Sequence, residues 1–311
     1  MKPVFIGGCD RSGTTMLGAM IGAHPDCITT PESQFKISAF QNINQNGNQL
    51  QQYLRNILNN WRYRLWAVDK SLGEIDVEKL GQNYGEILQW CVQQYAIKNN
   101  KKDFKFWIDH TPSNLKYALK LLQLFPGAKF IHIVRDGRAV AASLLNLDWG
   151  PNSIIHAAKF WLENVSFGLA LETHLTSDQI RRVQYKDILL EPERNMREIC
   201  DFLSLNYNSK ILRPSGLNLY QYTAEQHKLV GKELDKERIY SWKNKLSERE
   251  IEIFESITGD LLTMFGYEMT YGVYAKSPTF LEGIKMKINE KFRKYTINMV
   301  KYKKRIKNNM K

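Results

Sequence analysis

A loop flanked by two glycines constrains the fold of this chain more than any other feature of the sequence. The apolar run from Val4 leads into the loop, a helical pattern begins after it, and the loop reads Gly8-Cys9-Asp10-Arg11-Ser12-Gly13-Thr14-Thr15. Glycines at this spacing between a strand and a helix are typical of loops that hold a phosphate with backbone N–H groups and a helix N-terminus. The sequence therefore predicts an anion site on an α/β scaffold.

One residue of the loop limits the reactions that the loop can support. Thr14 stands where loops that hydrolyse ATP or GTP carry a lysine, so the contact of that lysine with the β- and γ-phosphates is missing. This disfavours a nucleotide hydrolase. A P-loop kinase-like phosphotransferase stays open as an alternative, although it too would need a lysine beside the phosphates.

Short apolar runs alternate with helical patterns along most of the chain. This alternation favours a parallel sheet covered by helices on both faces. The predicted fold class is α/β, a P-loop-like three-layer sandwich with a central parallel sheet, a helical insertion near residues 42–60 and a basic C-terminal helix. Strands are expected at 4–8, 27–30, 104–108, 129–134 and 181–185, and helices at 86–98, 112–125, 139–147, 154–175, 192–203 and 247–265.

The positive charge is concentrated at one end. The formal net charge of the 311 residues is +12, and the C-terminal tail (residues 275–311) holds 12 Lys or Arg residues against two acids, Glu282 and Glu290. The rest of the chain is nearly neutral, which disfavours specific nucleic-acid binding. We expect a catalytic domain at 1–274 and a separate tail at 275–311. In the tail, apolar residues recur every three or four positions among lysines, as in helices that lie on anionic membranes; docking of the tail on the body or on a partner is the alternative.

Four widely spaced cysteines form no CxxC pair, which argues against a zinc site and a disulfide framework. No run of about 18 apolar residues is present, and the first expected strand begins close to Met1. These observations predict a cytoplasmic protein without a signal peptide. The tail could hold this protein at a membrane surface.

The residues from Phe5 to Thr15 resemble the 5′-phosphosulfate loop of sulfotransferases that use 3′-phosphoadenosine 5′-phosphosulfate (PAPS), and most closely that of the protein-tyrosine sulfotransferase branch. That branch usually has proline where Asp10 stands. The likeness continues without a gap to Pro31-Glu32-Ser33, where Glu32 falls at the position of the branch's catalytic glutamate. The resemblance implies a catalytic role for Arg11 and Glu32. It implies that PAPS is bound by the loop residues Arg11, Ser12, Gly13, Thr14 and Thr15.

A second motif, at residues 125–139, is similar to the segment of the same family that binds the 3′-phosphate. The resemblance assigns Arg135 and Ser143 to that phosphate. Similar patterns occur around Tyr185 and at Trp242, and Lys232 precedes Trp242 at the distance where the branch has a PAPS-binding lysine. Together the likeness covers about residues 3–268, and the tail has no counterpart in it.

Two residues could take the proton from an acceptor. Besides Glu32, His110 lies in Asp109-His110-Thr111-Pro112 after an expected strand, where the tyrosine-sulfating branch has lysine and the cytosolic small-molecule sulfotransferases have their catalytic histidine. Reference pKa values of about 4.3 and 6.5 would leave Glu32 charged below pH 6 and His110 protonated there. Glu32 is the favoured base, with His110 as a hydrogen-bond donor, and the exchanged roles stay open.

The resemblance implies in-line transfer of the sulfuryl group from PAPS to a hydroxyl or amine, with release of 3′-phosphoadenosine 5′-phosphate (PAP) and no metal. The acceptor could be a sugar, a lipid, a peptide or a small alcohol, because fold-level likeness does not specify it. An alternative from a different class is a basic module that binds membranes or polyanions and keeps a degenerate nucleotide fold.

Overall fold

The chain folds around a sheet of parallel strands. The computed structural model describes residues 1–41, 49–68, 83–145, 147–218 and 231–309. Within them the sheet has five strands in the spatial order β2-β3-β1-β4-β5, and every neighbouring pair is parallel. The strands are β1 (Lys2–Gly7), β2 (Cys27–Thr30), β3 (Phe106–Asp109), β4 (Lys129–Val134) and β5 (Ile180–Gln184). The predicted parallel sheet is confirmed.

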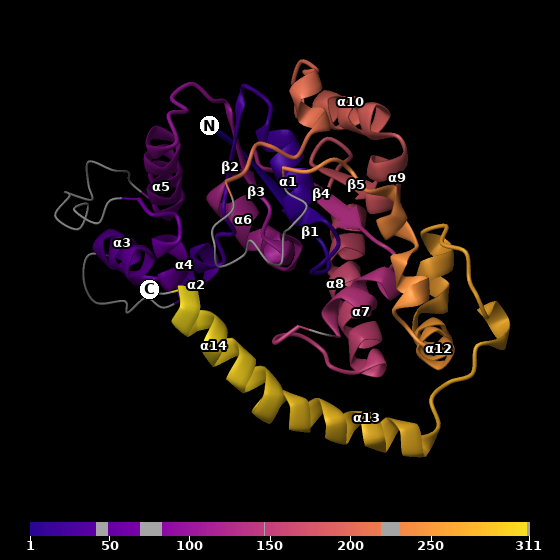
Figure 1. Cartoon of the computed structure of the whole chain (residues 1–311). Coiled ribbons are helices and arrows are strands. Elements are labelled where there is room, and N and C mark those ends of the chain that lie inside the picture. The colour runs from indigo at the N-terminus through magenta and orange to yellow at the C-terminus, as the bar shows by residue number, and fades with distance from the viewer. Residues whose placement is uncertain (42–48, 69–82, 146, 219–230, 310–311) are drawn as a thin grey trace.

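Side chains of the strands alternate between two buried faces. Phe5, Trp107 and Phe130 belong to one apolar cluster, while Val4 and Ile131 belong to another on the opposite face. Figure 1 shows helices on both sides of the sheet, which confirms the three layers. The first face is covered by α5 (Tyr84–Lys98) and α6 (Ala118–Leu124), and the second by α1 (Thr14–Gly22), α9 (Tyr185–Leu190) and α10 (Pro192–Leu203).

A third apolar cluster extends the core beyond the end of β4. It contains residues of α7 (Gly137–Leu144), α8 (Ile154–His174) and α12 (Glu248–Met264). Shorter helices complete the body: α2 (Phe35–Gln41), α3 (Gln49–Asn59), α4 (Trp61–Arg64), η3 (Pro112–Tyr117), η4 (Ser209–Leu212), η5 (Lys236–Ile239), η6 (Ser241–Asn244) and η7 (Gly272–Tyr274). Of the expected helical insertion, residues 42–48 lie outside the described residues, and α3 confirms the remainder.

One expected helix is divided in two. The pattern at 112–125 predicts a single helix, but the structure has the 3₁₀ helix η3 followed by α6. The Asn114 side-chain amide donates hydrogen bonds to the carbonyl oxygens of Ile6 and Asp109, at 2.9 and 3.0 Å. These bonds hold the first turn against the ends of β1 and β3, so the segment does not follow a continuous α-helix.

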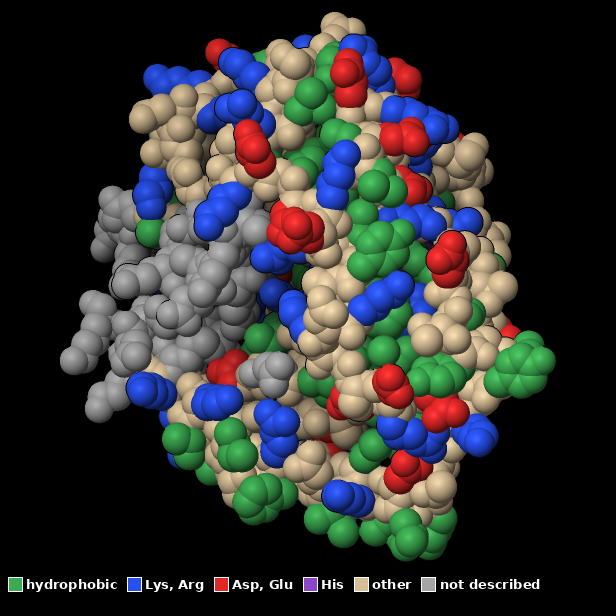
Figure 2. All heavy atoms as spheres, turned by 45° about the vertical axis from the view of Figure 1, so that its right-hand side comes forward, with side chains coloured by type: hydrophobic (Ala, Val, Ile, Leu, Met, Phe, Trp, Pro, Cys, Tyr) green, Lys and Arg blue, Asp and Glu red, His purple; other side chains and the backbone are tan. Residues whose placement is uncertain are grey.

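The tail forms a long helix that crosses the molecule beside its body (Figure 1). It consists of α13 (Phe280–Arg293), the π-helical segment η8 (Lys294–Asn298) and α14 (Met299–Asn309), and Thr279 begins it with a capping box. Figure 2 shows hydrophobic and cationic side chains along the lower edge of the molecule, where the tail runs in Figure 1. Among the described helices, none is both long and apolar enough to span a bilayer.

Candidate active site

The loop between β1 and α1 has a backbone that requires its glycines. A Cβ on Gly8 would lie 2.3 Å from the carbonyl oxygen of Ile133, and one on Gly13 would lie 2.6 Å from the ring of Tyr185. Gly13 also has a φ of 101°, and Arg11 has a φ of 69°, which is strained for a residue with a side chain. The loop is therefore packed directly on β4 and α9, and its strain is of the kind that gathers at ligand sites.

The loop and the first turn of α1 carry polar groups that suit an anion. Ser12 is 1% exposed, and its hydroxyl has no hydrogen-bond partner among the described residues. Thr14 and Thr15 are the first two residues of α1, and both are buried. An unpartnered buried hydroxyl costs free energy that a ligand can recover, and a helix N-terminus favours negative charge. The loop residues named from the sequence thus form one cradle that fits a phosphate.

Arg11 links this loop to the second phosphate motif. Its Nε donates to Ser143 Oγ of α7 at 3.1 Å, and its backbone carbonyl accepts from Arg135 Nη1 at 2.9 Å. Residues from the two motifs, which are more than 120 positions apart, therefore meet at one point on the carboxyl edge of the sheet. Such an edge is where open α/β sheets bind their ligands.

Arg135 is held in place on several sides. Its guanidinium stacks on the ring of Tyr185 at 4.4 Å, and its Nη2 donates to the carbonyl oxygen of Arg238 at 3.2 Å. Its Nε is buried without a partner among the described residues. The neighbouring Asp136 is engaged by Arg138, with contacts of 3.0 and 2.8 Å. The carboxylate of Asp136 is thus occupied by Arg138, and the assignment of Arg135 to an anion stays a prediction.

Glu32 follows β2 at the same edge. Its carboxylate accepts from Gln34 Nε2 at 3.0 Å, lies 4.0 Å from Arg62 Nη1, and belongs to a side chain that is 25% exposed. Desolvation, and after it the nearby charge of Asp10, raise its pKa to about 7 against the opposing charge of Arg62. A carboxyl group with this pKa can exchange protons near neutral pH.

His110 follows β3 and is almost completely enclosed. It is 3% exposed, it packs against Gly18 of α1, and neither ring nitrogen has a hydrogen-bond partner among the described residues. Burial lowers its pKa to about 4, although Asp109 acts in the opposite direction. The imidazole is therefore neutral near pH 7 and has one N–H to donate.

The order of these two pKa values corrects the expectation drawn from reference values. The carboxyl group of Glu32 has the higher pKa and the imidazole of His110 the lower one. Burial disfavours the charged form of each group, which raises the pKa of an acid and lowers that of a base. A base that works only above about pH 7 would be Glu32, not His110.

A buried ion pair lies directly behind both residues, and the sequence reasoning missed it. Lys36 Nζ is 3.1 Å from Asp109 Oδ2, and the hydroxyl of Ser33 donates to the same oxygen. The other oxygen, Oδ1, accepts from the backbone N–H of Thr111 at 2.9 Å. Ser33 and Lys36 follow Glu32 in the sequence, and Thr111 follows His110. The network therefore ties both segments to the carboxylate of Asp109. The only signal in the sequence was a lysine between Phe35 and Ile37 at the start of a helix.

Two further residues predicted to bind PAPS, Tyr185 and Lys232, differ from each other in their surroundings. Tyr185 is buried under Arg135 and against Gly13, so it supports both phosphate motifs. Lys232 is exposed, and within the described residues no contact joins it to the loop. Its assignment to PAPS stays a prediction. Across the part of the chain that the structure describes, no group of three or more His, Cys, Asp and Glu side chains converges as a metal site would.

Comparisons with known proteins identify relatives of this chain. The chain is 25% identical to the protein-tyrosine sulfotransferase of Drosophila melanogaster over 292 residues, which are 90% of this chain and 54% of that protein. It is 25% identical to protein-tyrosine sulfotransferase 1 of Danio rerio, over 86% of this chain and 73% of that one. The chain therefore spans about half the length of the fly protein.

Solved structures share the fold. The sulfotransferase domain of the Synechococcus PCC 7002 olefin synthase has a TM-score of 0.62 and 22% identity, covering 86% of this chain and 96% of that one. The sulfotransferase domain from the curacin biosynthetic pathway has a TM-score of 0.60 and 17% identity, covering 86% and 98%. The sulfotransferase family model matches residues 3–209, a span that contains the loop, Glu32, His110 and Arg135. The chain belongs to the sulfotransferase family.

Proposed function

We propose that this protein transfers the sulfuryl group of PAPS to a hydroxyl acceptor and releases PAP. The observation that carries the proposal is the convergence on Arg11, whose side chain contacts Ser143 and whose carbonyl accepts from Arg135. PAPS has an anion at each end, a 5′-phosphosulfate and a 3′-phosphate. Two anion-binding motifs that meet at one sheet edge match a ligand of this kind.

Different residues bind the two ends of PAPS. The loop, with Ser12, Gly13, Thr14 and Thr15 at the start of α1, holds the 5′-phosphosulfate. Arg135 and Ser143 hold the 3′-phosphate, with Tyr185 as the platform under Arg135. Arg11 lies between the two and stabilises the negative charge that develops on the departing phosphate, a contribution of about 3 to 4 kcal/mol for one preorganised donor.

Glu32 serves as the general base and His110 as a donor. The acceptor oxygen forms a bond to sulfur while the bond from sulfur to the phosphate oxygen breaks, and the acceptor proton passes to the Glu32 carboxylate. The N–H of neutral His110 donates to a sulfuryl oxygen or to the bridging oxygen. The pKa of about 7 makes Glu32 a suitable base near neutral pH.

Ligand-dependent thermal stability tests this proposal against a kinase-like activity. PAP in EDTA should raise the melting temperature, because a ligand that binds only the folded state stabilises it by about 2.7 kcal/mol at 100 times its Kd. ATP with Mg²⁺ should have a much smaller effect. Stabilisation by ATP with Mg²⁺ and not by PAP would contradict the proposal. Transfer of label from [³⁵S]PAPS to a hydroxyl compound completes the test.

We also infer that the tail holds the enzyme at an anionic membrane surface on the cytoplasmic side. The apolar side chains that recur along it are 42% to 82% exposed, namely Phe280, Ile284, Ile288, Phe292, Tyr295 and Met299. Both tail acids are used inside the molecule, since Glu282 pairs with Arg249 and Glu290 with Asn152. The outward surface of the tail is therefore apolar and cationic, as in helices that bind anionic lipid. The four cysteines are buried and unpaired, which suits a reducing compartment.

Vesicle flotation tests the membrane proposal. The protein should float with phosphatidylglycerol-containing vesicles and not with pure phosphatidylcholine. The double change Ile288→Ser and Phe292→Ser should abolish flotation, whereas Val273→Ser, at an exposed apolar residue outside the tail helix, should not. Equal flotation of all three proteins would show that the tail does not bind the membrane.

A further inference from the structure

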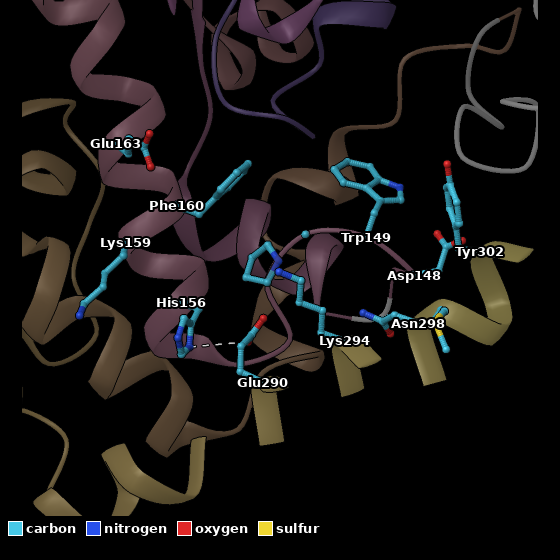
Figure 3. Close-up of a pocket in the computed structure, with 13 residues that line it drawn as sticks. Asp148, Trp149, His156, Lys159, Phe160, Glu163, Glu290, Lys294, Asn298 and Tyr302 are labelled. Carbon is cyan, nitrogen blue, oxygen red and sulfur yellow. Dashed lines mark ion pairs between the residues drawn. The ribbon is translucent and has the colours of Figure 1, made fainter. Parts of the chain in front are cut away.

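A pocket lies between the tail and the body of the protein. It has a volume of about 600 Å³ and is lined by three segments: the first half of α8, the loop 148–151 and the tail. Figure 3 shows Lys294 extending from the tail into this space, with Phe160 on the α8 side and Trp149 above the tail. The volume is within the usual range of small-molecule sites, about 300 to 1,000 Å³.

The pocket is on the same side of the molecule as the proposed reaction. The chain leaves β4 at its carboxyl end and enters β5 at its amino end, so α8 begins near the carboxyl edge where its first half lines the pocket. Trp161 Nε1 donates to the carbonyl oxygen of Arg135 at 3.1 Å. Glu163, a lining residue, pairs at 3.5 Å with Lys116 of η3, the helix that begins two residues after His110.

The tail wall of the pocket is anchored by specific bonds. Glu290 accepts from the backbone N–H of Asn152 at 2.8 Å and lies 3.6 Å from His156 Nδ1. The buried Asn298 donates to the side chain of Asn152 at 2.8 Å. Lining residues recur every four positions along the tail, from Glu290 to Tyr302. Of the exposed apolar tail residues described above, Phe280, Ile284, Ile288, Phe292 and Tyr295 do not line the pocket, whereas Met299 does.

The lining favours an uncharged ligand with both apolar faces and hydroxyl groups. Aromatic rings come from all three segments, as Trp149, Phe160 and Tyr302, and none of the described lining residues is Leu, Ile or Val. Aliphatic side chains in the described lining are limited to Pro151 and Met299, whereas an acyl chain would be expected to find a more extensive aliphatic surface. The lining also carries both signs of charge, Lys159 and Lys294 against Asp148, Glu163 and Glu290, and two of these acids are engaged, Glu163 by Lys116 and Glu290 by Asn152. Sugars match this surface, since their C–H faces stack on rings and their hydroxyls reach polar side chains.

We propose that this pocket binds a neutral sugar, the part of a carbohydrate acceptor that lies beyond the hydroxyl to be sulfated, and that the tail is a wall of the acceptor site. The proposal rests on the sulfotransferase function proposed above and names the substrate class for it.

Saturation-transfer NMR on the full-length protein tests the sugar site directly. The probes are the methyl β-glycosides of glucose, galactose and N-acetylglucosamine, with decanoate as the acyl-chain comparison. Wild-type protein should transfer saturation to the ring protons of at least one glycoside. Tyr302→Ala and Trp149→Ala should weaken binding about tenfold, the scale of one aromatic contact, and Trp149→Phe should restore it. Tyr295→Ala is the matched control, because Tyr295 is an exposed tail tyrosine that does not line the pocket.

Thermal stabilisation by PAP, measured on the same samples, separates this proposal from the function on which it rests. PAP should stabilise all four variants as it does the wild type. Saturation transfer without PAP binding would overturn the sulfotransferase proposal and leave the sugar site standing. No transfer to any glycoside, transfer to decanoate alone, or equal losses in Tyr302→Ala and Tyr295→Ala would overturn the sugar site.

Discussion

Lys36 and Asp109 form an ion pair that is almost completely shielded from water, with 3.1 Å between Nζ and Oδ2 and exposed fractions of 1% and 0%. The pair joins α2, which follows Glu32, to the end of β3, which precedes His110. The backbone geometry of both candidate catalytic groups therefore depends on one buried electrostatic contact.

Lys36→Met should destabilise the protein by about 3 to 5 kcal/mol, because it leaves the Asp109 carboxylate buried without its partner. Urea unfolding followed by circular dichroism measures the loss. The double variant Lys36→Met with Asp109→Asn should recover a large part of it, since no uncompensated charge is then buried. A loss below about 1 kcal/mol in the single variant would show that the pair does not carry this energy.

Arg135→Ala should weaken PAP far more than adenosine 5′-phosphosulfate, because only PAP carries the 3′-phosphate assigned to Arg135. A charge-assisted hydrogen bond contributes about 1.5 to 3 kcal/mol, which corresponds to roughly 10- to 150-fold in Kd. Calorimetric titration of both ligands measures the difference. Adenosine 5′-phosphosulfate also serves as the control for the loop, because Arg135 supports the Arg11 carbonyl. Equal losses for the two ligands would refute the assignment.

The acidic limb of kcat/KM should report the ionisation of Glu32. A carboxyl base works only when deprotonated, and its pKa is about 7, so activity should rise with pH through neutrality. His110, with a pKa of about 4, would instead give a flat profile between about pH 5 and 7 if it were the base.

Substitutions of Glu32 and His110 test which residue is the general base, independently of the wild-type pH profile. Glu32→Gln should lose at least about 10² in kcat with PAP affinity nearly unchanged, as expected for loss of a general base. His110→Ala should keep the limb near pH 7, and His110→Lys should retain more activity than His110→Ala because it keeps a donor. Disappearance of the limb in His110→Ala, together with an active Glu32→Gln, would require the roles to be exchanged.

Two neighbours should shift this limb in opposite directions. The charge of Asp10 raises the pKa of Glu32 and that of Arg62 lowers it. Asp10→Asn should therefore move the acidic limb to lower pH, and Arg62→Ala should move it to higher pH. The pH dependence of kcat/KM for both variants is the measurement, and shifts in the same direction would contradict this electrostatic account.

Features that depend on neighbouring residues in sequence could be predicted, and those that depend on distant contacts could not. β4 was predicted at its observed bounds, 129–134, because an apolar run between Gly127 and Arg135 determines it locally. The phosphate loop was recognisable for the same reason. The Lys36–Asp109 pair joins residues 73 positions apart, and its partners follow no local pattern. The order of the Glu32 and His110 pKa values expected from reference values was wrong. Both values depend on burial, and burial is set by elements that pack around these residues from elsewhere in the chain.

The position of β1 in the sheet sets the timing of active-site formation during synthesis. Among the five strands of the described sheet, β1 is the first to be synthesised, yet it is the central one, and its two edges pair only with the later residues 106–109 and 129–134. Gly8 reaches its final position only against Ile133, so the phosphate loop cannot assemble before β4 has emerged. Until then the nascent chain carries an unpaired apolar strand, the kind of edge that chaperones shield and that favours aggregation in truncated products.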